Sequence, residues 1–170
     1  MTLDRAPRFQ PEAMLRVLER HGVHYVVIGG LAATLHGSPL RTGDADICPA
    51  RDQANLTRLA AVLVEMSARI RAPDAPGGPS FACDAALLSS VQLLNLTTGL
   101  GELDIAFQPA GTEGYEDLLR HVERNDLDGL VVPVASLEDV IRSKRAAGRA
   151  KDAAALPTLE TLLSMRKRSS

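Results

Sequence analysis

The sequence is poor in aromatic residues and in cysteine. Among 170 residues it has no tryptophan, two tyrosines and three phenylalanines, which argues against a surface on which single-stranded nucleic acid stacks its bases. Its two cysteines, Cys48 and Cys83, lie far apart, with no CxxC pair and no histidine at zinc-ligand spacing. Neither a disulfide framework nor a zinc knuckle is expected, and we predict a reducing, cytoplasmic location.

Long hydrophobic runs are also missing. The longest run, from Tyr25 to Ala33, contains two glycines and is far shorter than the roughly 20 residues that a membrane-spanning helix needs. We therefore expect no membrane partner. With 45% hydrophobic and 24% charged residues, the chain is long enough to bury one core and too short for two, which predicts a single globular domain.

The charge is distributed unevenly along the chain. Residues 141–170 carry eight basic and two acidic side chains, whereas the whole sequence has a net charge of −2. The first 140 residues are therefore acidic. A basic end on an acidic body could meet a phosphate-rich ligand, although Arg166, Lys167 and Arg168 could equally form a solvated tail.

Hydrophobic periodicity and chain-breaking residues predict alternating helices and strands. We expect helices over residues 11–21, 31–36, 52–69, 113–124 and 136–147, with a last helix that begins at Pro157. Strands are expected over residues 23–28, 44–48, 91–97, 102–107 and 129–134, with Pro133 at a sheet edge or strand end. The stretch "RAPDAPGGPS", residues 71–80, predicts an exposed loop that either covers a substrate or simply connects two elements. This order indicates an α/β or α+β domain with a helical C-terminal end.

Acidic residues follow a pattern on two of the predicted strands. Side chains alternate along a strand, so Asp44 and Asp46 project from one face while Ala45 and Ile47 point into the core. Asp104 stands between apolar neighbours in "ELDIAF" in the same way. If the two strands are neighbours, three carboxylates converge. Their repulsion would raise their pKa values unless a cation were present, and a hard divalent ion such as Mg²⁺ prefers such oxygen ligands.

A glycine pair lies between the first strand and the short helix that follows it. Without a Cβ, Gly29 and Gly30 would leave backbone N–H groups open to a phosphate. Each signal alone is weak, since tight turns favour glycine and exposed strands often carry acids. The combination of the pair, the two spaced aspartates and the later acidic strand is much more specific.

The stretch "IGGLAATLHGSPLRTGDADI" resembles the signature of the DNA polymerase β-like nucleotidyltransferase superfamily. Within it, the sequence is most similar to bacterial AbiEii-type nucleotidyltransferases of toxin-antitoxin and abortive-infection systems, which carry a helix similar to "SKRAAGRAKD", residues 143–152. The resemblance implies a mixed sheet flanked by helices. It also implies a nucleotidyltransferase core over residues 1–135, with C-terminal helices over 136–170 that complete the same domain.

The resemblance assigns a role to each matched residue. Asp44, Asp46 and Asp104 would bind metal, with two Mg²⁺ ions expected, and Asp104 would also help to activate the attacking hydroxyl. Gly29 and Gly30 would hold the phosphates of a nucleoside triphosphate, and Lys144, with Lys151 or Arg149, would reach the triphosphate. On one continuous helix, Lys144 and Lys151 would share a face; an exposed basic face remains the alternative. Ser38, Arg41 and Thr42 would line the mouth. From the residues themselves, Asp152 either orients one of these cations or the base, or forms an i to i+3 pair with Arg149.

These features lead to several hypotheses about function. The first is an enzyme that moves a nucleoside monophosphate from an NTP to an acceptor hydroxyl, with the 3′ end of tRNA as acceptor and a cognate antitoxin as partner in a toxin-like member. The second keeps this chemistry but uses a small molecule such as an aminoglycoside, or a protein, as acceptor. The third is a catalytically inactive module that only binds nucleotide or a partner.

Overall fold

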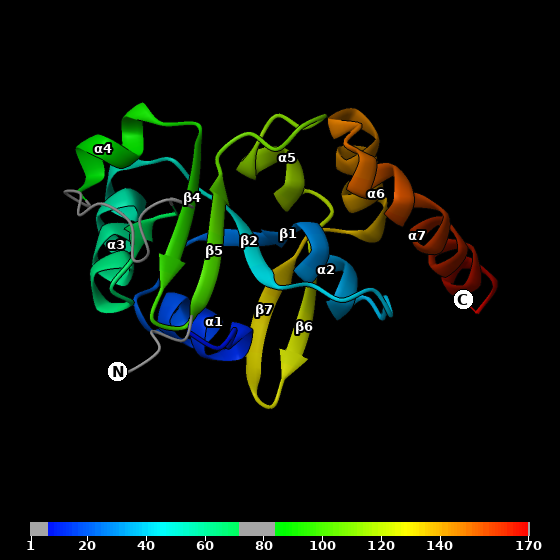
Figure 1. Cartoon of the computed structure of the whole chain (residues 1–170), viewed down its shortest axis with the longest axis horizontal. Coiled ribbons are helices and arrows are strands. Elements are labelled where there is room, and N and C mark those ends of the chain that lie inside the picture. The colour runs from blue at the N-terminus through cyan, green and yellow to red at the C-terminus, as the bar shows by residue number, and fades with distance from the viewer. Residues whose placement is uncertain (1–6, 72–83, 170) are drawn as a thin grey trace, which may run out of the picture.

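The computed structural model describes residues 7–71 and 84–169, which form one mixed sheet flanked by helices (Figure 1). The seven strands are β1 (Tyr25–Ile28), β2 (Asp44–Pro49), β3 (Arg69–Ile70), β4 (Leu93–Thr98), β5 (Gly101–Ala106), β6 (Glu123–Leu127) and β7 (Leu130–Val134), in the spatial order β3-β4-β5-β2-β1-β7-β6. The helices are α1 (Pro11–Arg20), α2 (Gly29–Leu35), α3 (Gln53–Glu65), α4 (Ala85–Ser90), α5 (Tyr115–Leu119), α6 (Leu137–Ala147) and α7 (Ala150–Arg168). The predicted fold class and helical C-terminal end are confirmed.

The two faces of the sheet differ around β2 and β5. Ala45 and Ile47 of β2, with Leu103 and Ile105 of β5, are buried in the hydrophobic core. Helices α1 and α3 add Leu18, Leu59 and other fully buried side chains to this core; in Figure 1, α3 lies to the left of β4 and α1 lies at the lower end of β5. The alternate residues of β2 and β5 therefore face away from the core.

A buried asparagine ties α3 to the chain around β1 and β2. The Asn55 side chain is fully buried and makes three hydrogen bonds to backbone. It accepts from His24 N (2.7 Å) and donates to His24 O (2.9 Å) and Ala50 O (2.7 Å). Through these three bonds, the buried Asn55 amide holds the segments that flank the two strands.

The prediction of one helix over residues 113–124 was wrong. Helix α5 ends at Leu119, and the chain continues as β6, which pairs with β7 in an antiparallel hairpin. The missed signal was the Asp128–Gly129 pair between Leu127 and Leu130, since this dipeptide favours two-residue hairpin turns. Strand β7 lies between β1 and β6, so Pro133 is near a strand end but not at an edge.

Helix α6 begins as predicted, because the Ser136 side chain accepts a hydrogen bond from Asp139 N (3.1 Å). The prediction that Pro157 starts the last helix was wrong, since α7 begins at Ala150 and contains Pro157. Leu159 is fully buried beyond the proline, and Glu160 pairs with Arg145 of α6. These contacts with the rest of the molecule keep α7 continuous although the proline lacks an N–H.

Two further predictions concern the loop and the membrane. The breaker-rich stretch 71–80 lies outside the described residues, apart from Arg71. Within residues 7–71 and 84–169, no helix combines the length and the apolar character that a bilayer span requires.

Helix α3 is shorter than the predicted helix over residues 52–69, because the chain turns at Ser67 in a left-handed conformation and enters β3.

Replacing Asn55 with alanine should destabilise the fold. Three backbone groups would lose the partner that the buried Asn55 amide provides, and we expect a loss of about 3 kcal/mol in the free energy of unfolding and a melting temperature lower by roughly 10 °C. Calorimetry of Asn55→Ala measures this. Thr57→Ala, on the exposed side of the same helix, is the control, and an equal effect of both substitutions would contradict the prediction.

Candidate functional site

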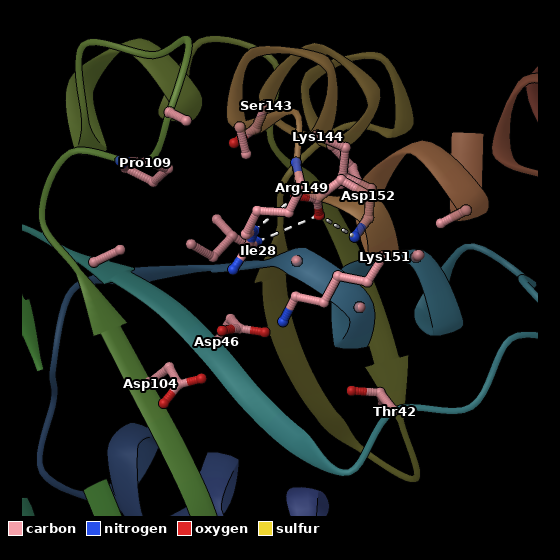
Figure 2. Close-up of a pocket in the computed structure, with 18 of the residues that line it drawn as sticks. Ile28, Thr42, Asp46, Asp104, Pro109, Ser143, Lys144, Arg149, Lys151 and Asp152 are labelled. Carbon is pink, nitrogen blue, oxygen red and sulfur yellow. Dashed lines mark hydrogen bonds and ion pairs between the residues drawn. The ribbon is translucent and has the colours of Figure 1, made fainter. Parts of the chain in front are cut away.

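The three acidic residues singled out from the sequence come together in the structure. Strands β2 and β5 are parallel neighbours, with Asp46 directly opposite Asp104 and Asp44 opposite Glu102. One carboxylate oxygen from each of Asp44, Asp46 and Asp104 lies within 4.8 Å of the others. Figure 2 shows Asp46 and Asp104 on the two adjacent strands, at the edge of the same pocket. We call these three residues the carboxylate triad.

The triad is electrostatically strained. Burial, with the negative charges of Asp44 and Asp104, raises the pKa of Asp46 to about 7. Burial and a hydrogen bond with Asp44 raise the pKa of Asp104 to about 6, against the opposing charge of Arg71. The Arg71 guanidinium lies 2.9 Å from Asp104 Oδ1. Without a further cation, the three groups therefore resist being charged together.

The donor set of the triad suits a hard divalent cation. All three donors are carboxylate oxygens, and no sulfur or imidazole is among them. Mg²⁺ is bound in proteins by a few carboxylates together with water and substrate phosphates. A divalent cation would also relieve the repulsion that raises the pKa values of Asp46 and Asp104. The residues thus fit the predicted magnesium site.

The position of the Asp46 carboxylate leaves no room for a side chain at residue 29. The backbone of Gly29 is in the left-handed region (φ +62°), and a Cβ there would lie 2.5 Å from Asp46 Oδ2. Helix α2 begins at Gly29, earlier than the predicted start at Leu31. A side chain on Gly30 would meet Thr42 Oγ1 at 3.1 Å. The pair thus allows the end of β1 to approach the triad closely.

Basic side chains from α6 and α7 surround a buried aspartate. Asp152 has no exposed surface. Its carboxylate accepts from Arg149 Nε (2.7 Å) and lies 3.5 Å from Lys144 Nζ. Burial opposes its ionisation, but the bond from Arg149 and the charge of Lys144 hold the pKa of Asp152 below its ordinary value. The dashed lines in Figure 2 mark these contacts, and the Lys151 side chain extends toward Asp46 in the same view.

The cations do not share the face of one helix, contrary to our expectation. Gly148 adopts a left-handed conformation and ends α6, and Arg149 is extended before α7 begins. The sharp turn nevertheless places Lys144 and Lys151 in the lining of one cavity. Lys144 and Lys151 therefore lie at the same cavity as expected, but on two helices and not on one.

A cavity of about 800 Å³ connects the triad to the basic residues. The residues predicted from the sequence that line it are Gly29, Gly30, Arg41, Thr42, Asp44, Asp46, Asp104, Lys144, Arg149, Lys151 and Asp152. Ser38 is not in this lining, and its buried hydroxyl accepts a hydrogen bond from Leu40 N (3.2 Å). The Thr42 hydroxyl donates to Asp44 O (2.9 Å), which braces the start of β2.

Sequence reasoning missed the neutral part of this lining and one cation. Gln92, Leu93, Asn95, Ala106 and Gln108 also line the cavity. The alternation of β4 could have identified Asn95, which pairs with Asp104. Arg71 was missed because it begins a stretch read only as a loop, although its backbone N–H bonds to Asn95 O (2.9 Å).

The fold was compared with known proteins. No known family profile and no curated protein matches the sequence, but solved structures match nearly the whole chain. The lincosamide antibiotic adenylyltransferase LnuA with lincomycin bound has a TM-score of 0.60 at 16% identity, covering 91% of this chain and 99% of its own. A Thermotoga maritima protein classed as a nucleotidyltransferase has a TM-score of 0.56 at 20% identity, covering 95% and 99%. The chain has a nucleotidyltransferase fold.

A third structure extends the same similarity. ANT(2")-Ia in complex with adenylyl-2"-tobramycin has a TM-score of 0.55 at 15% identity, covering 94% of this chain and 96% of its own. At such identities the similarity concerns the nucleotidyltransferase fold and not the substrate. The predicted fold is therefore confirmed, and membership of the superfamily stays a prediction from the sequence resemblance.

Gly29→Ala should displace Asp46 and disturb the triad. The added methyl group would overlap the carboxylate, so we expect Mg²⁺ binding, measured by titration calorimetry, to weaken by about tenfold or more. Gly99→Ala is the control, because a Cβ there makes only an ordinary 3.5 Å contact with Met66 O. Unchanged Mg²⁺ binding in Gly29→Ala would contradict the close approach of Asp46.

The stability of the metal-free protein should depend on pH through Asp46. A carboxyl group whose pKa is raised to about 7 in the folded state favours folding below its unfolded pKa, and this contribution is lost as the pH rises through 7. Asp46→Asn should therefore raise the melting temperature relative to wild type by several degrees more at pH 8 than at pH 4. Asp128→Asn, in the exposed turn after β6, is the control. A difference that does not vary with pH would contradict the assignment.

Proposed function

We propose that the protein is a Mg²⁺-dependent nucleotidyltransferase that moves a nucleoside monophosphate from an NTP to an acceptor hydroxyl and releases pyrophosphate. The observation that carries the proposal is the carboxylate triad, facing three basic side chains across one cavity. The nucleotidyltransferase fold agrees with it. An acidic cluster alone would suit many ions, whereas acids opposite Lys144, Arg149 and Lys151 suit a metal-bound triphosphate.

Each charged group has a part in this reaction. Asp44 and Asp46 hold Mg²⁺, which when bound lowers the pKa of the acceptor hydroxyl and offsets charge at the reacting phosphate. Asp104 accepts the proton of the acceptor hydroxyl, whose oxygen forms a bond to the α-phosphorus. The bond between the α-phosphorus and the bridging oxygen breaks, and pyrophosphate leaves with the electron pair. Lys144 and Lys151 bind the β- and γ-phosphates and compensate for their charge.

Asp152 is a positioning residue in this scheme. Its buried carboxylate holds Arg149 and Lys144 at the edge of the cavity. Both cations are thereby kept from collapsing onto the triad, which remains open to metal. The proposed role combines the two readings that the sequence left open for Asp152, the orientation of a cation and the i to i+3 pair with Arg149.

We further propose a small-molecule acceptor. The cavity, of about 800 Å³, has the size of a site for small ligands, and two of the structures with this fold are enzymes crystallised with an antibiotic or its adenylylated product. The basic helices that would hold tRNA are largely engaged in ion pairs: Arg142 with Asp117 and Asp139, Arg145 with Glu160, Arg149 with Asp152 and Arg166 with Glu123. The AbiEii-type subgroup, a tRNA 3′-end acceptor and a cognate antitoxin remain predictions from the sequence resemblance.

The proposed activity can be tested with α-labelled NTPs, Mg²⁺ and two acceptor pools, a set of hydroxylated small molecules and total tRNA. We expect Mg²⁺-dependent pyrophosphate release with label in a small molecule, and a loss of about 100-fold or more in Asp46→Asn because the site loses a metal ligand. Asp128→Asn is the matched control. NTP binding without release in the presence of either pool would favour the binding module, and label only in tRNA would restore the toxin-like hypothesis.

A further inference from the structure

The arrangement of charges indicates where the acceptor enters, if the proposed function is right. In an in-line displacement, the attacking oxygen and the departing pyrophosphate lie on opposite sides of the phosphorus. Lys144, Arg149 and Lys151 hold the pyrophosphate side, on α6 and α7. The acceptor must therefore approach from the other side of the triad, across β5 and β4, where Asp104 can take its proton.

A small surface at the end of β4 and β5 lines the cavity on that side. Asn95 pairs with Asp104, and Leu93 pairs with Ala106, so these side chains lie in neighbouring positions of the sheet. Gln92 precedes β4, and Gln108 follows β5. We call Gln92, Leu93, Asn95, Ala106 and Gln108 the β4–β5 platform, and all five line the cavity.

The platform offers both donors and acceptors of hydrogen bonds. Arg51 donates to Gln92 Oε1 (2.9 Å), and because arginine has only donors this fixes the Gln92 amide with its NH₂ group free. Gln108 turns its Nε2 toward Thr112 O (3.5 Å), which leaves its Oε1 as an acceptor. Arg51 also binds the carbonyl groups of Ser89 and Val91 and stacks on Phe107 at 4.5 Å, so the loop that carries Gln92 is held in place.

The platform has no unpaired charge within the described residues. Four carboxylates line the cavity as a whole, namely the triad and Asp152, and none of them belongs to the platform; Asp152 is bound by Arg149 and Lys144. Glu102, the next acid along β5, lies 3.5 Å from Arg71 Nε. The platform itself therefore offers no carboxylate to a polycation, and Leu93, which is 58% exposed, adds an apolar surface instead.

We propose that the β4–β5 platform binds an uncharged, hydroxyl-bearing acceptor with an apolar group. The amides of Gln92, Asn95 and Gln108 bond its polar groups, and Leu93 covers its apolar part. This inference deepens the proposed function and depends on it, because the acceptor is defined by the reaction at the triad.

The test measures kcat/KM for label transfer from an α-labelled NTP to probes of three charge classes. Methyl and n-hexyl glucoside represent uncharged acceptors, kanamycin represents polycations and total tRNA represents polyanions. We expect transfer to n-hexyl glucoside to exceed transfer to the other probes. Leu93→Ala should lower kcat/KM for n-hexyl glucoside about tenfold and for methyl glucoside less than twofold, because only the hexyl chain buries the leucine. Val64→Ala, at an exposed site on α3, is the control.

A charge substitution tests the polar part of the platform. Gln108→Glu should lower kcat/KM for n-hexyl glucoside about fivefold and raise it for kanamycin, because the acceptor surface gains a negative charge. Gln53→Glu, exposed at the start of α3, is the matched control.

The outcomes separate the two proposals. Preferred labelling of kanamycin or tRNA overturns the inference, as does absence of label in every probe while Mg²⁺-dependent NTP binding persists. Equal effects of Leu93→Ala on both glucosides also overturn it. Absence of Mg²⁺-dependent NTP binding would instead overturn the proposed function.

Discussion

The site depends on the parallel pairing of β2 with β5. This register sets Asp46 opposite Asp104, and the hydrophobic core enforces it, because Ile47, Leu103 and Ile105 are buried on the opposite face. A slip of one residue would move these apolar side chains into solvent and the acids into the core. Burial of apolar surface thus holds together three carboxylates that would otherwise separate, and the raised pKa values of Asp46 and Asp104 are the electrostatic consequence.

Two groups of charged residues lie near the triad, one that contacts it directly and one on the other side of the cavity. Arg71 contacts the triad from β3, at Asp104, and within the described residues no other basic side chain lies within an ion-pair distance of it. Behind the cavity, the buried Asp152 binds Arg149 and Lys144. Asp152 holds these two cations by ion pairs and offsets part of their charge, so neither of them forms an ion pair with the triad. The acids remain available to metal and the basic groups remain near the place of the triphosphate.

The residues proposed to carry out the reaction and those proposed to select the acceptor lie in different parts of the cavity. The groups proposed to bind metal and triphosphate are charged and come from β2, β5, α6 and α7, whereas the β4–β5 platform is neutral and comes mainly from the hairpin. The fold is shared with LnuA, solved with lincomycin, and with ANT(2")-Ia, solved with adenylyl-2"-tobramycin. At 15–16% identity the shared fold does not define the acceptor, which therefore has to be inferred from the platform.

The sequence alone determined most of the elements and the acids of the site, because alternation in a strand is a local property. Asp44, Asp46 and Asp104 could each be placed on the polar face of a strand before any partner strand was known. Predictions from local sequence patterns were wrong where contacts between distant parts of the chain determine the secondary structure. Pro157 lies inside α7, and directly after it the buried Leu159 and the ion pair between Arg145 and Glu160 hold the helix against the rest of the molecule. Only the tertiary structure brought Arg71 to Asp104 and the three amides to the cavity, since these side chains acquire their neighbours through pairing of strands and packing of loops.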